Sequence, residues 1–142
     1  MSFDFKILNG DLVIGTNGDL DKVENTEKLV QDILKMLMTE VGSNEFYPWY
    51  GSLISSSMIG STYDYEFISS VAENQIRSSL EILQNLQREQ SLKQIVTPSE
   101  LFAAIKSVNV IRNEIDPTFF SVLLTVLTKN LNTANTSFNV TL

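Results

Sequence analysis

Two acidic residues, Glu40 and Glu45, lie next to the aromatic run Phe46-Tyr47-Pro48-Trp49-Tyr50, and their types and spacing could support hydrolytic chemistry. A glycoside hydrolase needs two carboxyl groups across a cleft, and aromatic side chains line many small-molecule sites. The chain has 17 acidic residues, however, so two acids beside one loop are expected from composition alone. No further motif ties them to a cleft. We therefore expect two solvated acids near a helix end, no catalytic residue, and a protein that is not an enzyme.

The composition excludes several other chemistries. The chain has no cysteine and no histidine, which removes thiolate catalysis, the Ser-His-Asp triad and nearly all zinc sites. Asp19 and Asp21 follow the pair Asn17-Gly18, but the later glycine and terminal glutamate of a calcium loop are missing. No phosphate-binding glycine loop is present. We predict no metal and no cofactor.

Charge and hydropathy limit the partners. The net charge of −7 disfavours nucleic acid and anionic lipid, and the ten basic residues form no block. The most apolar run, Phe119 to Leu127, is too short to span a bilayer. Met1 to Phe5 lacks the basic start of a signal peptide. We expect a soluble intracellular chain with no nucleic-acid or membrane partner.

The first half of the chain predicts a hairpin and a helix. Asn9-Gly10 separates two short apolar runs, and this pair favours a type I′ hairpin turn. Asn25 or Thr26 is expected to cap a helix that runs to about Val41, with Gly42 as its stop. A long loop follows to about Asp64, broken by a helical turn near residues 52–58.

The second half predicts one long helix and a β-rich end. A regular apolar stripe indicates a helix from Tyr65 to Arg88. Thr97-Pro98-Ser99-Glu100 resembles a helix start and predicts a short helix over 101–105. Residues 108–113 alternate imperfectly, 119–129 form an apolar strand with both faces covered, 130–136 form a loop, and 137–142 form a terminal strand.

These elements predict a single α+β domain over residues 1–142. We expect one small mixed β-sheet, built from the N-terminal hairpin and the C-terminal strands, packed on two main helices. In the terminal strand, Phe138, Val140 and Leu142 should point to one face. Its polar side chains, without lysine or proline as a guard, leave an edge able to accept another chain. Alternatively, the N-terminal hairpin closes that edge.

The aromatic run admits two interpretations. It is either a satellite core beneath a long loop or a surface that another protein covers, because tryptophan and tyrosine concentrate at protein contacts. Both interpretations give Trp49 and Tyr50 a central place.

The order of these signals resembles a known family. The motif positions are Leu37-Met38-Thr39, Gly42, Pro48 and Tyr50-Gly51. They are similar to the pattern of the baseplate wedge and sheath-initiator family of contractile bacteriophage tails, whose members are often mislabelled as lysozymes. The resemblance covers nearly the whole chain. Two departures are clear: Ser43-Asn44 stands where relatives often carry Glu-Arg, and residues 97–100 stand where many carry Glu-Pro-Arg.

The resemblance implies a structural role in the virion, at the tail baseplate, after assembly in the host cytoplasm. The implied partners are the helical core bundle of the baseplate wedge and the tail sheath protein, with tail tube or hub proteins as further neighbours. Sheath arms would extend the sheet of such a protein. Thr39, Gly42, Pro48 and Gly51 carry over as motif positions only. A small regulatory binding protein resembling an anti-adaptor is the alternative, and a muramidase is the third hypothesis.

Overall fold

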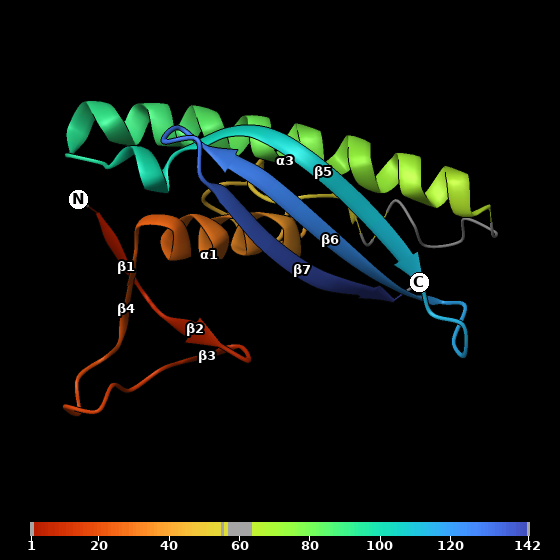
Figure 1. Ribbon diagram of the computed structural model, residues 1–142, viewed down its shortest axis with the longest axis horizontal. Coiled ribbons are helices and arrows are strands. Elements are labelled where there is room, and N and C mark those ends of the chain that lie inside the picture. Colours follow the sequence, from red (N-terminus) through yellow and green to blue (C-terminus); the bar gives the residue numbers. More distant parts are fainter. Residues whose placement is uncertain (1, 55, 57–63, 142) are drawn as a thin grey trace.

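The computed structural model describes residues 2–54, 56 and 64–141. Two helices lie on one face of a curved three-stranded sheet, and a separate N-terminal arm, defined as residues 2–24, projects away from them (Figure 1). The α+β class and the two main helices are confirmed. Among the described residues, no helix combines the length and the apolarity needed to cross a bilayer.

The strands are divided among three antiparallel sheets. In the arm, β1 (Phe3–Phe5) pairs with β4 (Lys22–Glu24), and β2 (Ile7–Leu8) pairs with β3 (Asp11–Leu12). The third sheet has the order β5-β6-β7. The prediction that the hairpin joins the C-terminal strands in one sheet is therefore wrong. The arm is attached instead through side chains of a helix, as described below.

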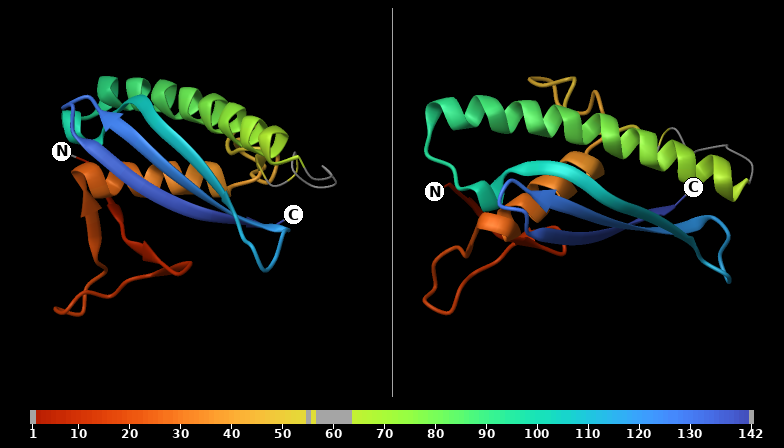
Figure 2. Two further views of the ribbon diagram at one scale, coloured as in Figure 1. Left: turned by 45° about the vertical axis from the view of Figure 1, so that its right-hand side comes forward. Right: turned by 45° about the horizontal axis from the view of Figure 1, so that its top comes forward.

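The turn at the tip of β2 and β3 follows the sequence prediction. Asn9 and Gly10 both have positive φ, +53° and +82°, as a type I′ turn requires. In the left view of Figure 2 the arm projects below the helices and the sheet. Because a two-stranded ribbon has little stability of its own, the arm depends on its attachment to the body.

Helix α1 (Asn25–Met38) is shorter than predicted. Its N-cap is Glu24, which makes no capping hydrogen bond with its side chain, and the carboxamide oxygen of Asn25 instead accepts a hydrogen bond of 2.8 Å from the Thr97 hydroxyl. The helix ends at Thr39, whose N–H donates to the Lys35 carbonyl. Gly42 therefore does not stop the helix, because it lies three residues beyond the cap.

Helix α3 (Tyr65–Lys93) begins with a side-chain cap and extends past the predicted Arg88. The Asp64 carboxylate accepts from the Glu66 N–H at 3.1 Å. The predicted apolar stripe is buried, and it includes Ile68, Ala72, Ile76, Leu80 and Leu83.

A 3-10 turn, η1 (Pro98–Glu100), leads directly into β5 (Phe102–Arg112). The predicted short helix over 101–105 is wrong, because those residues pair with the end of β6 (Phe119–Thr128). Strand β7 is also longer than predicted and covers Thr133–Thr141. The turn between β6 and β7 is tight, with Leu131 in the left-handed region at φ +63°, where a three-residue hairpin loop needs such a residue.

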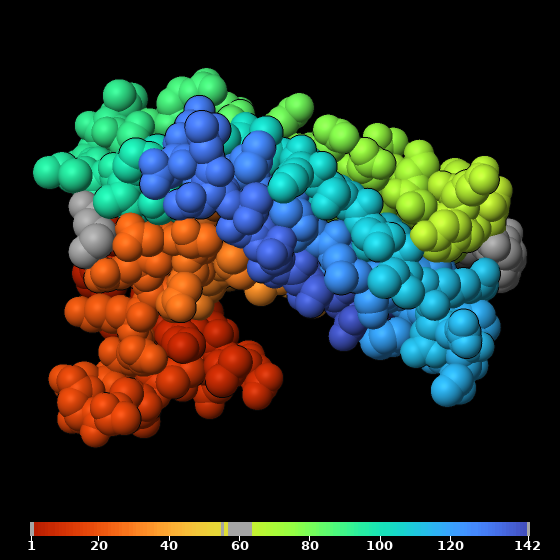
Figure 3. Space-filling view, in the orientation of Figure 1, coloured from red at the N-terminus to blue at the C-terminus, as the bar shows by residue number. Residues whose placement is uncertain are grey.

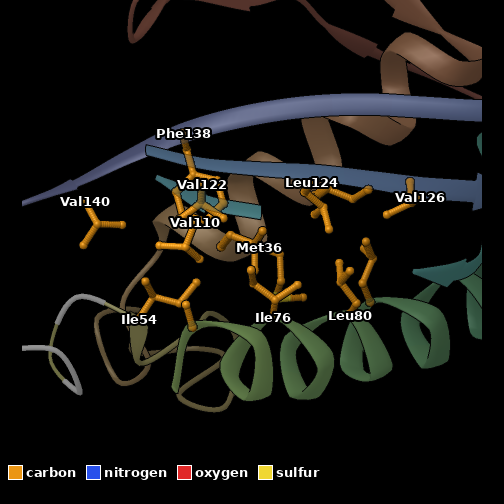
Figure 4. Packing of buried hydrophobic residues seen from close by; sticks show 14 of the residues in the cluster. Met36, Ile54, Ile76, Leu80, Val110, Val122, Leu124, Val126, Phe138 and Val140 are labelled. Carbon is orange, nitrogen blue, oxygen red and sulfur yellow. The ribbon is translucent and has the colours of Figure 1, made fainter. Parts of the chain in front are cut away.

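The sheet packs on the helices through one face. Alternate residues of β6 and β7 point inward, among them Phe120, Val122, Leu124, Phe138 and Val140, and they meet Met36 of α1 and Ile76 and Leu80 of α3 (Figure 4). The other face of β6 is open, with Leu123 41% exposed, so the predicted cover on both faces is absent there.

Candidate interaction surfaces

The aromatic loop, defined as residues 39–52, is held by backbone hydrogen bonds that involve the motif positions Thr39, Gly42 and Pro48. The Ser52 N–H donates to the Thr39 carbonyl at 2.8 Å, and the Gly42 N–H donates to the Pro48 carbonyl at 3.0 Å. Because both ends of the loop lie side by side, the segment is a closed structure on the surface.

The backbone conformation and the close packing at Gly51 require a glycine at this position. Its φ is +121°, and a Cβ built there would lie 2.4 Å from the Thr39 carbonyl oxygen. Its own carbonyl accepts from the buried Ser79 hydroxyl of α3 at 3.2 Å, and the Ser52 hydroxyl donates to the Leu37 carbonyl at 2.6 Å. The loop is thereby fastened to both helices.

The aromatic rings on this frame divide between core and surface. Trp49 makes edge-to-face contacts with Tyr47 and Tyr50, at centroid distances of 5.8 Å and 6.4 Å. Tyr50 packs against the core, whereas Trp49 is 46% exposed and Phe46 is 86% exposed. The loop is therefore a satellite core only at Tyr50, and its remaining rings form an outward apolar surface.

The arm is clamped to α1 by one buried glutamine. The Gln31 side chain accepts from the Ile7 N–H at 2.9 Å and donates to the Phe5 carbonyl at 2.8 Å. It thus offers the arm backbone the donor and acceptor that a neighbouring strand would offer. Gln31 is only 9% exposed, and the sequence alone did not single it out.

A partly exposed ion pair adds to this clamp. Burial by itself would raise the pKa of Asp4, but its hydrogen bond and ion pair with Lys35, together with Gln31, lower that pKa below 3.8. Burial by itself would lower the pKa of Lys35, but the hydrogen bond with Asp4 and the charges of Asp32 and Asp4 raise it above 10.5. Burial also raises the pKa of the nearby Tyr50 phenol.

A second polar cluster, also missed by sequence reasoning, ties η1 to the rest of the fold. Glu100 is 2% exposed, and its carboxylate accepts from the hydroxyls of Ser2 at 2.5 Å and Thr97 at 3.2 Å. The Gln87 side chain spans the turn by donating to the Glu100 carbonyl and accepting from the Phe102 N–H. Residues 97–100 therefore serve as a packed joint between α3 and β5.

The edge of β7 that faces away from β6 is not paired with any described strand. The Thr128 N–H donates to the Asn132 carbonyl, and the register then continues without a bulge to Phe119 and Thr141. In an antiparallel ladder, alternate residues bond to the neighbouring strand and the others point outward. The outward backbone groups of β7, called the open edge here, therefore belong to Thr133, Asn135, Ser137, Asn139 and Thr141.

Of the three residues predicted for the strand edge, two have their side chains in the core and the third is not described. Phe138 and Val140 are buried in the core at 6% and 4% exposure, and Leu142 lies outside the described residues. The side chains of the open-edge residues are polar and uncharged, and Asn135 and Asn139 are hydrogen-bonded to Thr125 and Ser121 of β6. The N-terminal hairpin does not close this edge, because β1 to β4 pair only with one another.

A groove of about 440 Å³ lies between the arm, α1 and the start of β7. Figure 3 shows the hollow between the arm, in red and orange, and the edge of the sheet, in dark blue. Its apolar lining comes from all three parts and consists of Ile7, Val23, Val30, Leu34 and Ala134. Lys6 and Glu27 also line this groove, called the arm groove below.

The two carboxylates considered for hydrolysis are both on the surface. Glu40 and Glu45 are exposed on the aromatic loop, and neither lines the arm groove. Within residues 2–54, 56 and 64–141, no group of three or more acidic side chains is placed to hold a metal ion.

The fold is similar to that of a solved structure. It matches the crystal structure of a Geobacter sulfurreducens protein described as a candidate tail lysozyme, with a TM-score of 0.61 over 82% of this chain and 89% of that chain. The sequence identity is 15%, so the likeness shows a shared fold. No family model matches the chain, and no curated protein matches it.

Proposed function

We propose that this protein is a structural component of a contractile phage tail baseplate, where it binds the wedge and starts sheath assembly by offering β7 to sheath arms. The single observation that carries this proposal is the open edge. Strand β7 has an apolar face in the core, an unpaired outer backbone, and no charged side chain among its outward residues. Such an edge accepts an extended chain by strand addition.

Two further observations support this proposal. The similar fold of a protein named for a phage tail agrees with a tail component. The exposed rings of the aromatic loop offer a second surface on the same molecule, suited to the helical core bundle of the wedge. One surface could then hold the protein in the baseplate while the other remains free for the sheath.

A pair of proline variants tests the role of the open edge. Ser137→Pro removes an outward N–H, so it should block strand addition while costing about 1 kcal/mol or less of folding stability. Val140→Pro removes an N–H that points toward β6 and belongs to that ladder. It also removes a buried side chain, so it should lower the folding stability by about 3 kcal/mol.

The measurement is sheath polymerisation on baseplates assembled with each variant, beside the unfolding free energy of the purified protein. We expect a folded Ser137→Pro protein that enters baseplates but supports no sheath growth. Normal sheath growth on Ser137→Pro baseplates would show that initiation takes place elsewhere.

The muramidase hypothesis predicts that the purified protein clears a cell-wall suspension, whereas a structural role predicts that it does not. Because neither Glu40 nor Glu45 lines the arm groove, we expect no clearing of a cell-wall suspension. Clearing that the Glu45→Gln variant abolishes would overturn our assignment of a structural role.

A further inference from the structure

The arm groove adjoins the open edge of β7, so a pocket that could hold a side chain lies beside an unpaired strand edge. Thr133, Ala134 and Asn135, the first residues of β7, form one wall of the groove. A strand added to this edge would pass the groove at the end of β7 that holds Thr133 to Asn135.

The register decides which incoming side chain enters the groove. Residues directly opposite each other on paired strands point to the same face. Ala134 points to the helix side of the sheet and is 3% exposed, so the incoming residue paired with Ala134 also points to that side. There it meets Val30 and Leu34, which are half-buried on α1.

The shape and chemistry of the groove restrict that residue. The small methyl group of Ala134 leaves space beside it, and the opposite wall is formed by Ile7 and Val23 of the arm. Since Gln31 bonds the arm backbone to α1, this wall is fixed in place. Lys6 and Glu27 also line the groove, but a side chain directed at Val30 and Leu34 would bury apolar surface if it is aliphatic and would lose hydration there if it is charged.

We propose that the arm groove is an anchor pocket for the incoming strand, and that it selects a single aliphatic residue at the position paired with Ala134. This inference rests on the proposed function for the identity of the strand as a sheath arm. The rest of the incoming strand is bound through its backbone and is free to vary in sequence.

Disulfide trapping tests whether the incoming residue paired with Ala134 enters the groove, and it is practicable because the chain has no cysteine of its own. The variant is Val30→Cys in the groove, and the matched control is Ile82→Cys, another half-buried aliphatic position on a helix face that does not line the groove. The probe is a peptide of alternating threonine and serine, nine residues long like β7, whose one central cysteine carries a thionitrobenzoate mixed disulfide. The protein thiolate attacks the peptide sulfur and releases thionitrobenzoate, so the exchange needs no added oxidant. We expect trapping at Val30→Cys to be faster by about tenfold or more, since strand pairing raises the local thiol concentration.

Two N-methylated peptides separate strand pairing from simple thiol access. In one, the methyl group sits on the amide of the central cysteine; in the other, methyl groups sit on the amides of its two neighbours. An antiparallel strand directs the neighbours' amides to β7, and a parallel strand directs the central amide to it. The rate advantage should vanish for one of the two peptides. An equal rate at Val30→Cys and Ile82→Cys, or an advantage that survives both methylations, would overturn the proposal.

The sheath assay distinguishes this failure from failure of the proposed function. If Ser137→Pro stops sheath growth but trapping shows no preference for Val30→Cys, only the anchor pocket is wrong. If trapping prefers Val30→Cys but Ser137→Pro baseplates grow sheath normally, the pocket stands and the role in sheath initiation is wrong.

Discussion

The aromatic loop exposes mainly side chains, whereas the open edge of β7 exposes mainly backbone groups. In the loop, the backbone is closed on itself through Thr39, Pro48 and Ser52, and the exposed groups are aromatic rings. In the edge, the large side chains Phe138 and Val140 are buried and the exposed groups are backbone amides. Under the proposed function, the first arrangement would bind a partner by shape and apolar area, and the second would bind an extended backbone with little dependence on its sequence.

This difference fits two different kinds of contact. An aromatic surface on a fixed loop suits one permanent neighbour, because its rings need a matching pocket. A strand edge suits a repeated or variable arm, because main-chain hydrogen bonds supply the affinity. Substitutions should therefore act on the loop through side chains and on the edge through the backbone.

The largest expected effect is on the frame of the loop. Gly51→Ala would place a Cβ 2.4 Å from the Thr39 carbonyl oxygen, at a φ of +121°. We expect a loss of about 3 kcal/mol or more in unfolding free energy, measured by chemical denaturation. The control is Gly42→Ala, where φ is +89° but no atom lies within 4 Å, and its cost should be about 1–2 kcal/mol. Equal costs would mean that the Gly51 contact does not hold the loop.

The next effect concerns the rings that the loop presents. Trp49→Ala should lower folding stability by only about 1 kcal/mol, since it loses edge-to-face contacts from a half-exposed position. It should weaken wedge association by about 2 kcal/mol or more. Phe67→Ala on α3 is the matched control, with 54% exposure, and should leave association unchanged. A Trp49→Ala protein with unchanged stability and assembly would remove this residue from both roles.

A smaller effect should appear in the pH dependence of stability. The folded pKa of Asp4 lies below 3.8, so its contribution is complete above that value and is lost as the pH falls through the folded pKa. The folded pKa of Lys35 lies above 10.5, so its contribution is complete below that value and is lost as the pH rises through the folded pKa.

Asp4→Asn should therefore flatten the acid limb of a stability curve while leaving the neutral plateau lowered by less than about 1 kcal/mol, because both side chains are 31–39% exposed. The measurement is unfolding free energy against pH. An unchanged acid limb in Asp4→Asn would show that this pair does not fasten the arm.

The smallest effect is expected for side chains on the open edge. Asn139→Ala removes the acceptor of a 3.0 Å hydrogen bond from the Ser121 hydroxyl and should cost about 0.5 kcal/mol. Sheath growth should not change, because the backbone of β7 is intact. A strong assembly defect in Asn139→Ala, at unchanged stability, would mean that the edge is recognised through side chains and that the contrast with the loop is wrong.

Local signals in the sequence determined much of this fold. The Asn9-Gly10 turn, the apolar stripe of α3 and the β-rich character of β6 depend on near neighbours in the chain, so the residues themselves specify them. The absence of histidine and cysteine from the sequence excluded whole classes of chemistry in the same way. The spacing of Thr39, Gly42, Pro48 and Gly51 marked a special loop, although not the bonds that close it.

Only the tertiary structure decided how these parts meet. Residues 102–105 became strand because β6 offers them a ladder, which outweighs a weak local preference for helix. Gln31 and Glu100 became buried joints through contacts with residues 24 and 98 positions away in the chain, and no local pattern encodes such contacts. The arm groove forms where the arm, α1 and the start of β7 meet. Long-range packing alone therefore places this groove beside the open edge of β7.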